Sequence, residues 1–196
     1  AQPTLSPSDL GGAKALAGDQ GADEETAKKY GSLVHFYLEH LAGSGPDEWG
    51  GLLDALRPRD TDVQNPAAGE AMHVLSDPAH AHIFNPTTLA EVSITANLGA
   101  RRIHGAIDRL IVTDTKVLAV DFKSNRVVPD AAEKCPHGLL RQMGAYAHAL
   151  AQIYPDRVIE TAILWTRTSE LMVLPHEIVR NALHETPYLD EAGQGT

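Results

Sequence analysis

The feature of this sequence that most restricts its fold is the run VLAVDFK, from Val117 to Lys123. It is apolar apart from Asp121 and Lys123, and its composition is typical of a β-strand. Successive side chains of a strand point to opposite faces, so the two charged residues share one face. The opposite face, which we expect to be buried, carries Leu118, Val120 and Phe122. The fold must therefore hold an apolar strand that brings two charges to one place.

A second strand precedes this one, over Gly105–Asp114 (GAIDRLIVTD). The polar segment Thr113–Lys116 between the two strands is short enough for a hairpin turn. In such a hairpin Asp108 can face Asp121 across the strand pair. Two carboxylates and the amine of Lys123 then meet on neighbouring strands.

Hydrophobic periodicity and the placement of Gly and Pro divide the rest of the chain into helices and strands. We expect helices over Glu24–Leu41, around Glu48–Leu56 and Pro66–Leu75, over His137–Ile153, and from Pro175, with this proline at the first helical position. Besides the hairpin, we expect strands over Glu91–Ala96, Arg157–Trp165 and Leu171–Leu174, and loops over Pro78–Pro86 and Arg126–Pro136. Residues 1–22 read as an extended lead-in and 187–196 as a tail, which leaves one domain over residues 23–186. This order predicts an α/β fold with a mixed central sheet flanked by helices.

The overall charge bears on what the chain can bind. Its 26 acidic and 16 basic residues give a net charge of −10, whereas contacts to nucleic-acid phosphates come from lysine and arginine. The charge therefore argues against a free-standing nucleic-acid-binding protein. Part of the acidity lies in patches such as Asp23–Glu25 and Asp190–Glu191, which need not face a substrate. A nucleic-acid enzyme with this composition is best explained if a larger assembly delivers the substrate.

Length, cysteine content and hydropathy indicate the setting in which the chain works. With 196 residues, 43% of them hydrophobic, it can bury one good core. Its single cysteine, Cys135, excludes a disulfide framework and favours a reducing compartment such as the cytoplasm. Apolar runs stay well short of the roughly eighteen residues of a membrane span, and no signal-peptide pattern opens the chain, so we expect no membrane association. The first residue is Ala rather than Met, which suggests an excised piece of a longer polypeptide.

The charged residues of the hairpin suit the hydrolysis of a phosphodiester. Asp108 and Asp121 are hard oxygen ligands, of the kind that Mg²⁺ or Mn²⁺ prefers. Lys123 can act as a cation beside the charge that develops on the phosphate. The simpler alternative is an exposed hairpin face with an ion pair, which is the usual role of an isolated Asp-x-Lys. The second aspartate, on a neighbouring strand within apolar flanks, favours the catalytic interpretation.

Two predicted helices add further candidates. Gln142 and Tyr146 lie at i and i+4 and share one face, from which both could reach a scissile phosphate or a metal-bound water. The alternative for them is the polar edge of an amphipathic helix. On the first helix, Gly31 at i−4 from His35 leaves room for a ligand or another chain segment. His35 is either a metal ligand or a partly buried, hydrogen-bonded histidine.

Together these motifs resemble the RecB-type branch of the PD-(D/E)XK nucleases, and within it the C-terminal nuclease domains of AddA-type helicase–nuclease subunits. The likeness rests on Gly31-x-x-x-His35, Ile107-Asp108-Arg109-Leu110, Asp121-Phe122-Lys123-Ser124-Asn125 and Gln142-x-x-x-Tyr146, and extends to Pro7–Gly12 and Ala162–Thr166. The resemblance implies a restriction-endonuclease-like fold and a Mg²⁺- or Mn²⁺-dependent exonuclease that cuts single-stranded DNA. It implies a metal held by His35, Asp108, Asp121 and the Phe122 carbonyl. It implies catalytic roles for Lys123, Gln142 and Tyr146.

The resemblance also implies partners. They are DNA, an attached helicase domain of the same polypeptide and an AddB-like subunit, acting together in double-strand-break repair and recombination. Ile107 stands where the family name has a proline, a departure that is common in this branch. Glu91, at the head of its predicted strand, is either an accessory acid or a solvent-exposed glutamate.

Other functions are less well supported by the sequence. A non-catalytic module with the same fold would bind DNA or a partner protein, but a retired site should lose at least one of Asp108, Asp121 and Lys123. An oxygenase-like site on His104 and Asp108 would place them about 13 Å apart along a strand, too far to share a metal. The single cysteine excludes the iron–sulfur nucleases of the superfamily, which need four. With no Gly-x-x-x-x-Gly-Lys motif, we expect no ATP hydrolysis by this chain.

Overall fold

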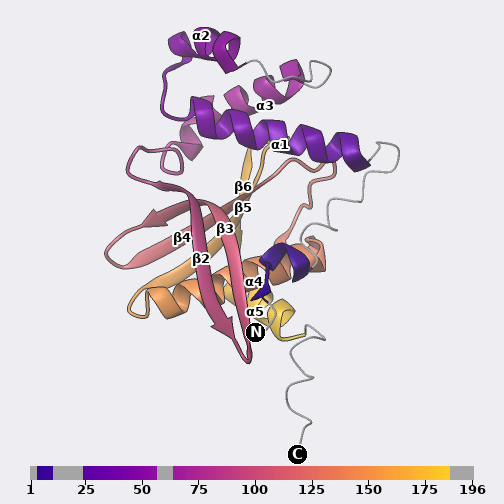
Figure 1. Ribbon diagram of the computed structural model, residues 1–196, viewed down its shortest axis with the longest axis vertical. Helices are drawn as coiled ribbons and strands as arrows, with labels where there is room; N and C mark the ends of the chain where they lie inside the picture. Colours follow the sequence, from indigo (N-terminus) through magenta and orange to yellow (C-terminus); the bar gives the residue numbers. More distant parts are fainter. Residues whose placement is uncertain (1–3, 11–23, 57–63, 186–196) are drawn as a thin grey trace, which may run out of the picture.

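The predicted hairpin lies at the centre of a mixed sheet (Figure 1). The computed structural model describes residues 4–10, 24–56 and 64–185, and within them the sheet has six strands. The strands are β1 (Thr4–Leu5), β2 (Leu89–Leu98), β3 (Arg101–Val112), β4 (Lys116–Lys123), β5 (Val158–Trp165) and β6 (Glu170–Leu174). The helices are α1 (Glu24–Leu41), α2 (Pro46–Leu56), α3 (Gln64–Ser76), α4 (His137–Ile153) and α5 (His176–His184), with short 3₁₀ helices η1 (Pro7–Leu10), η3 (Pro78–His80) and η4 (Ala132–Lys134).

The strand order is β1-β3-β4-β5-β6, and β2 also pairs with β3. The pairs β2–β3, β3–β4 and β5–β6 are antiparallel, whereas β1–β3 and β4–β5 are parallel. Arg109 pairs with Val120, and Val112 with Val117, so the expected hairpin and its register are confirmed. The α/β class with a mixed, helix-flanked sheet is confirmed as well.

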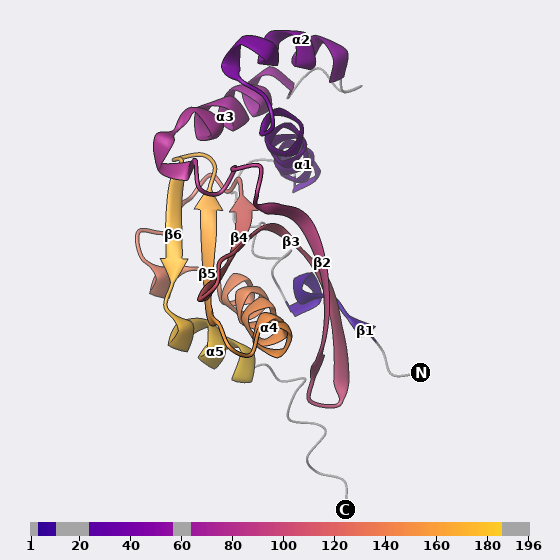
Figure 2. The same cartoon turned by 90° about the vertical axis from the view of Figure 1, so that its left-hand side faces the viewer.

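Helices cover both faces of this sheet, and Figures 1 and 2 show α1, α2 and α3 gathered away from α4 and α5. Val117 and Ala119 of β4 pack in one core with α4 and α5. Val120 and Phe122 pack in a second core with α1 and α3. The predicted alternation along β4 is therefore correct, but the face that carries Asp121 is buried too. A strand covered on both sides explains the nearly continuous apolar run in the sequence.

Several boundaries differ from those expected. The helices over Glu24–Leu41 and His137–Ile153 have the predicted ends, because their apolar stripes are long and regular. The lead-in instead contains β1 and η1, and the two expected loops contain η3 and η4. The β2–β3 hairpin extends well beyond the predicted strands and turns at Gly99, whose φ of 58° suits glycine. Pro175 stands at the N-cap of α5 and not at its first helical position. The predicted tail, 187–196, lies outside the described residues.

α4 and α5 pack closely because α4 has a glycine at their contact. A Cβ on Gly144 would lie 2.2 Å from the carbonyl oxygen of Val179 and 3.0 Å from the Cβ of Leu183. Such distances exclude any side chain unless α5 moves. Gly144 therefore allows α4 and α5 to pack into the layer that buries one face of the sheet.

No helix in the described part of the chain is long and apolar enough to cross a membrane.

Candidate active site

The predicted site lies where the pairing between β2 and β3 is irregular. The β2–β3 pairs on either side of Asp108 join Ala90 to Arg109 and Val92 to Ile107. Between them stands Glu91, whose φ of 47° is unusual for a residue with a side chain. The carboxylate of Asp108 accepts a 2.7 Å hydrogen bond from the main-chain N–H of Phe122 on β4. A side chain thus bonds to the main chain of the neighbouring strand and anchors Asp108 beside β4.

Asp121 and Lys123 form a buried ion pair on β4. The Nζ of Lys123 lies 2.8 Å from Oδ2 of Asp121, and the two side chains are only 12% and 6% exposed. Burial lowers the pKa of Lys123, but the adjacent Asp121 charge outweighs burial and raises the pKa overall. Burial raises the pKa of Asp121. The positive charge of Lys123 lowers this pKa and the negative charge of Asp108 raises it, so that the pKa is raised overall. Lys123 is therefore a stable cation, and the two carboxylates lie close enough to repel each other.

His35 brings α1 to the same place. Its Nε2–H donates to the main-chain carbonyl of Phe122 over 3.0 Å, and its Nδ1 lies 3.4 Å from Oδ1 of Asp108. Burial lowers the pKa of His35, but the hydrogen bond and charge of Asp108 raise it overall. A Cβ on Gly31 would lie 2.9 Å from the hydroxyl oxygen of Ser124. The space beside this glycine is therefore occupied by the chain segment that follows β4.

Gln142 and Tyr146 of α4 are buried below this group. The Gln142 amide donates to the Tyr146 hydroxyl over 3.1 Å, and that hydroxyl donates to the carbonyl of Ala106 over 2.7 Å. The Oε1 of Gln142 is buried and accepts no hydrogen bond from the described residues. Burial, followed by the charge of Asp121, raises the pKa of Tyr146, which stays a neutral hydroxyl. The pair is thus near Asp121 but is bonded to β3.

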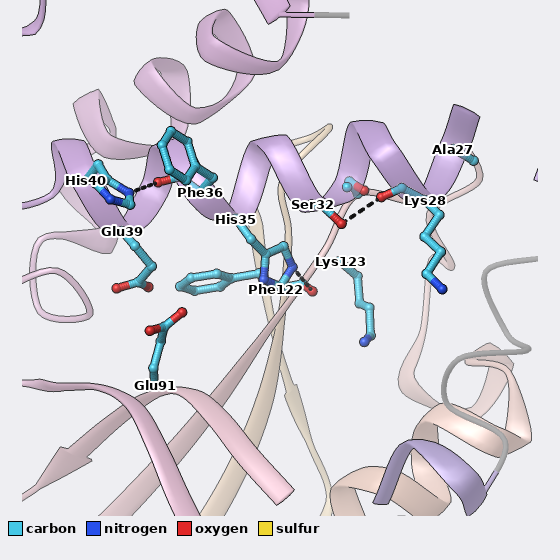
Figure 3. A pocket seen from close by; sticks show the side chains of 12 residues that line it. Ala27, Lys28, Ser32, His35, Phe36, Glu39, His40, Glu91, Phe122 and Lys123 are labelled. Carbon is cyan, nitrogen blue, oxygen red and sulfur yellow. Dashed lines mark hydrogen bonds between the residues drawn. The ribbon is translucent and has the colours of Figure 1, made fainter. Parts of the chain in front are cut away.

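A pocket of about 520 Å³ opens between α1 and the ends of β2 and β4 (Figure 3). Lys28 and Lys123 lie at one end of it and Glu39 and Glu91 at the other, with His35 between them. The pocket therefore has a basic end and an acidic end, and the histidine separates the two.

Glu39 is a pocket residue that the sequence interpretation missed. Its Oε2 lies 3.2 Å from Nη2 of Arg109, which is almost fully buried. Burial raises the pKa of Glu39 against the charge of Arg109, and the charge of Glu91 raises it further. Its position four residues after His35, on the same helix face, is the signal that could have identified it.

The donor atoms gathered here are one imidazole, two carboxylates and one main-chain carbonyl, a set that suits a hard divalent ion. The mutual repulsion of Asp108 and Asp121 is a further reason for a cation to bind between them. Among the described residues, however, no three His, Cys, Asp or Glu side chains are grouped so as to hold a metal ion. The donors instead contact one another, and Lys123 contacts Asp121. The donor chemistry fits a metal, and binding would require these contacts to be exchanged.

Comparisons with known proteins bear on the family and the fold of this chain. Residues 10–194 match the family model described as the PD-(D/E)XK nuclease superfamily. A crystal structure of a candidate exonuclease from Eubacterium rectale has a similar fold, with a TM-score of 0.56 and 12% sequence identity over 94% of this chain and 77% of that one. The crystal structure of the protein SSO0001 gives a TM-score of 0.40 at 13% identity, over 98% and 78% of the two chains. No curated protein sequence matches the chain.

Proposed function

Because this chain belongs to the PD-(D/E)XK nuclease superfamily, we propose that it is a metal-dependent exonuclease acting on single-stranded DNA. The observation that carries the proposal is the meeting of Asp108, Asp121, Lys123 and His35 at one end of the β3–β4 pair, beside an open pocket. These four residues come from three elements of the fold, β3, β4 and α1. Burial of an ion pair without a functional role is costly, which supports a catalytic use of this one.

The proposed metal is Mg²⁺ or Mn²⁺, and His35, Asp108, Asp121 and the Phe122 carbonyl would hold it. A divalent ion there would polarise the phosphoryl oxygen and lower the pKa of a bound water. The donor set described above supports this assignment.

Lys123 is proposed to stabilise the negative charge that develops on the phosphate during cleavage. Its raised pKa keeps it protonated at neutral pH, so it acts as a cation and not as a general base. Tyr146 also keeps its proton, because burial and the charge of Asp121 raise its pKa. With Gln142, it would hold the phosphate or the attacking water by hydrogen bonds. The buried Oε1 of Gln142 accepts no hydrogen bond from the described residues, and as an acceptor it suits the attacking water and not the phosphate.

The proposed setting is the nuclease domain of an AddA-type subunit, with a helicase domain on the same polypeptide and an AddB-like partner. The net charge of −10 supports this setting, because an acidic domain gains little affinity for DNA from its own surface. An attached motor would hold the DNA and supply single strands to the pocket.

A cleavage assay tests the proposed activity. Linear 5′-labelled single-stranded DNA should be shortened in low salt with Mg²⁺ or Mn²⁺ and should stay intact with EDTA, because the acidic site needs the cation. Circular single-stranded DNA is the matched control and should survive, because an exonuclease needs an end. Intact linear DNA in the presence of either metal, with a folded protein by circular dichroism, would contradict the proposal.

His35→Ala is expected to weaken Mn²⁺ binding by about tenfold, because it removes one donor from the proposed set. Isothermal titration calorimetry measures the affinity without relying on activity. His148→Ala is the control, since His148 bonds to the carbonyl of Asn97 near the end of β2 and does not line the pocket. An unchanged Mn²⁺ titration for His35→Ala would remove this residue from the metal site.

A further inference from the structure

Glu70 of α3 is a nearly buried carboxylate, 10% exposed, that joins two layers of the molecule. Its Oε2 accepts a hydrogen bond from the hydroxyl of Tyr30 on α1. Its Oε1 accepts a 2.6 Å hydrogen bond from the hydroxyl of Thr166, the residue directly after β5. The side chain of Arg167 lies 3.9 Å from Oε2 and is positioned over the Tyr30 ring. One carboxylate therefore ties α1 and α3 to the end of the sheet.

Thr166 in turn holds the main chain of the site lysine. Lys123 and Trp165 form the last pair between β4 and β5. Immediately beyond it, the N–H of Thr166 donates to the Lys123 carbonyl over 2.9 Å, and the Thr166 hydroxyl lies 3.2 Å from the same oxygen. Thr166 is fully buried. The residue that bonds to Glu70 thus also fixes where the backbone of Lys123 lies.

The other contact of Glu70 falls on the segment of α1 that faces the site. Tyr30 directly precedes Gly31, which packs against Ser124 after β4, and His35 follows within the same helix. Burial, then the hydrogen bond to Glu70, raises the pKa of Tyr30, so its hydroxyl stays protonated and donates. Glu70 therefore holds α1 at the point where this helix meets the end of β4.

We propose that Glu70 and Thr166 are positioning residues, which set Lys123 on β4 and His35 on α1 at the spacing that the reaction requires. This inference rests on the proposed nuclease function and extends it to residues that do not touch the substrate. Placement matters because a displacement of about 1 Å can lower a rate by about a hundredfold. The Glu70 carboxylate contacts both α1 and the end of β5. Loss of the Thr166 hydroxyl should therefore displace Lys123 and His35 and leave the substrate-binding surface in place.

Thr166→Val and Thr166→Ser form a matched pair for the kinetic test. The valine variant keeps the size and the main-chain N–H but loses the hydroxyl, and the serine variant keeps the hydroxyl. Thr166→Val should lower kcat by about tenfold to a hundredfold with KM for single-stranded DNA unchanged, and Thr166→Ser should restore kcat. Glu160→Gln is the control, because Glu160 pairs with Lys116 at the opposite end of β4 and β5. Wild-type kcat in Thr166→Val, or an equal loss in Thr166→Ser, overturns the inference.

A second measurement does not depend on activity. Glu70→Gln should make the amide of Thr166 exchange its hydrogen about tenfold faster, because glutamine keeps one acceptor oxygen and cannot accept from both Thr166 and Tyr30. Glu160→Gln should leave that exchange rate unchanged. Equal protection of Thr166 in Glu70→Gln and the wild type overturns the inference. If the wild-type protein cuts no DNA, the proposed function fails, and hydrogen exchange alone decides whether Glu70 holds this part of the structure.

Discussion

Asp121→Asn and Lys123→Met are each expected to lower kcat for metal-dependent cleavage of single-stranded DNA by about a thousandfold. Asp121→Asn removes a negative charge from the proposed metal-binding set. Lys123→Met keeps an unbranched apolar stem but removes the ammonium that lies 2.8 Å from Asp121. Single-turnover cleavage of an end-labelled strand, with Mg²⁺ and protein in excess, measures the loss.

Folding has to be separated from chemistry in this experiment. Each single variant leaves its partner as a buried, uncompensated charge, and such changes typically cost about 3–5 kcal/mol of stability. The double variant Asp121→Asn/Lys123→Met removes both charges, so we expect it to regain stability without regaining activity. Lys116→Met, at the exposed start of β4, is the control and should keep both the stability and the activity of the wild type. A double variant that is folded and cuts at the wild-type rate would show that the pair is not part of the site.

Gly144→Ala is expected to lower the free energy of unfolding by about 3 kcal/mol, the upper part of the range for overpacking a core. The added methyl group would meet the main chain of α5 at 2.2 Å from the Val179 carbonyl oxygen, and a backbone atom cannot rotate away as a side chain can. Urea denaturation followed by circular dichroism measures the change.

Gly69→Ala is the matched control for that measurement. Gly69 lies within α3, and a Cβ there would meet nothing within 4 Å. Alanine is preferred to glycine in a helix by about 1 kcal/mol, so this variant should be slightly more stable than the wild type. Equal stabilities for Gly144→Ala and Gly69→Ala would mean that α5 adjusts freely, and that the close approach of α4 and α5 is not needed.

The local parts of this fold could be predicted from sequence because each has a strong period of its own. The alternation from Val117 to Lys123 indicated a strand, and the short polar turn before it placed Asp108 across from Asp121. The apolar stripes of α1 and α4 determined both ends of each helix. These features depend on neighbours within a few residues along the chain.

The parts that could not be predicted depend on contacts between distant residues. Thr4 and Leu5 form a strand only because they pair with Arg102 and Ile103 on β3. The bond from Thr166 to Glu70 joins residues 96 positions apart, and nothing in the spacing of either indicates the other. The same holds for Glu39 and Arg109, whose ion pair is formed only when α1 packs on the sheet.

The left-handed backbone of Glu91 has a consequence for attempts to stabilise this protein. A conformation of this kind costs about 1–3 kcal/mol in a residue with a side chain. It occurs opposite Asp108, at the point where a regular β2–β3 ladder would be the most stable arrangement. Selection for heat resistance alone would favour either a glycine at position 91 or a regular strand there. A glycine would remove a carboxylate from the pocket, and a regular strand would place Asp108 in a regular β2–β3 pair. Under the proposed function, thermostability and activity are therefore selected in opposite directions at this position.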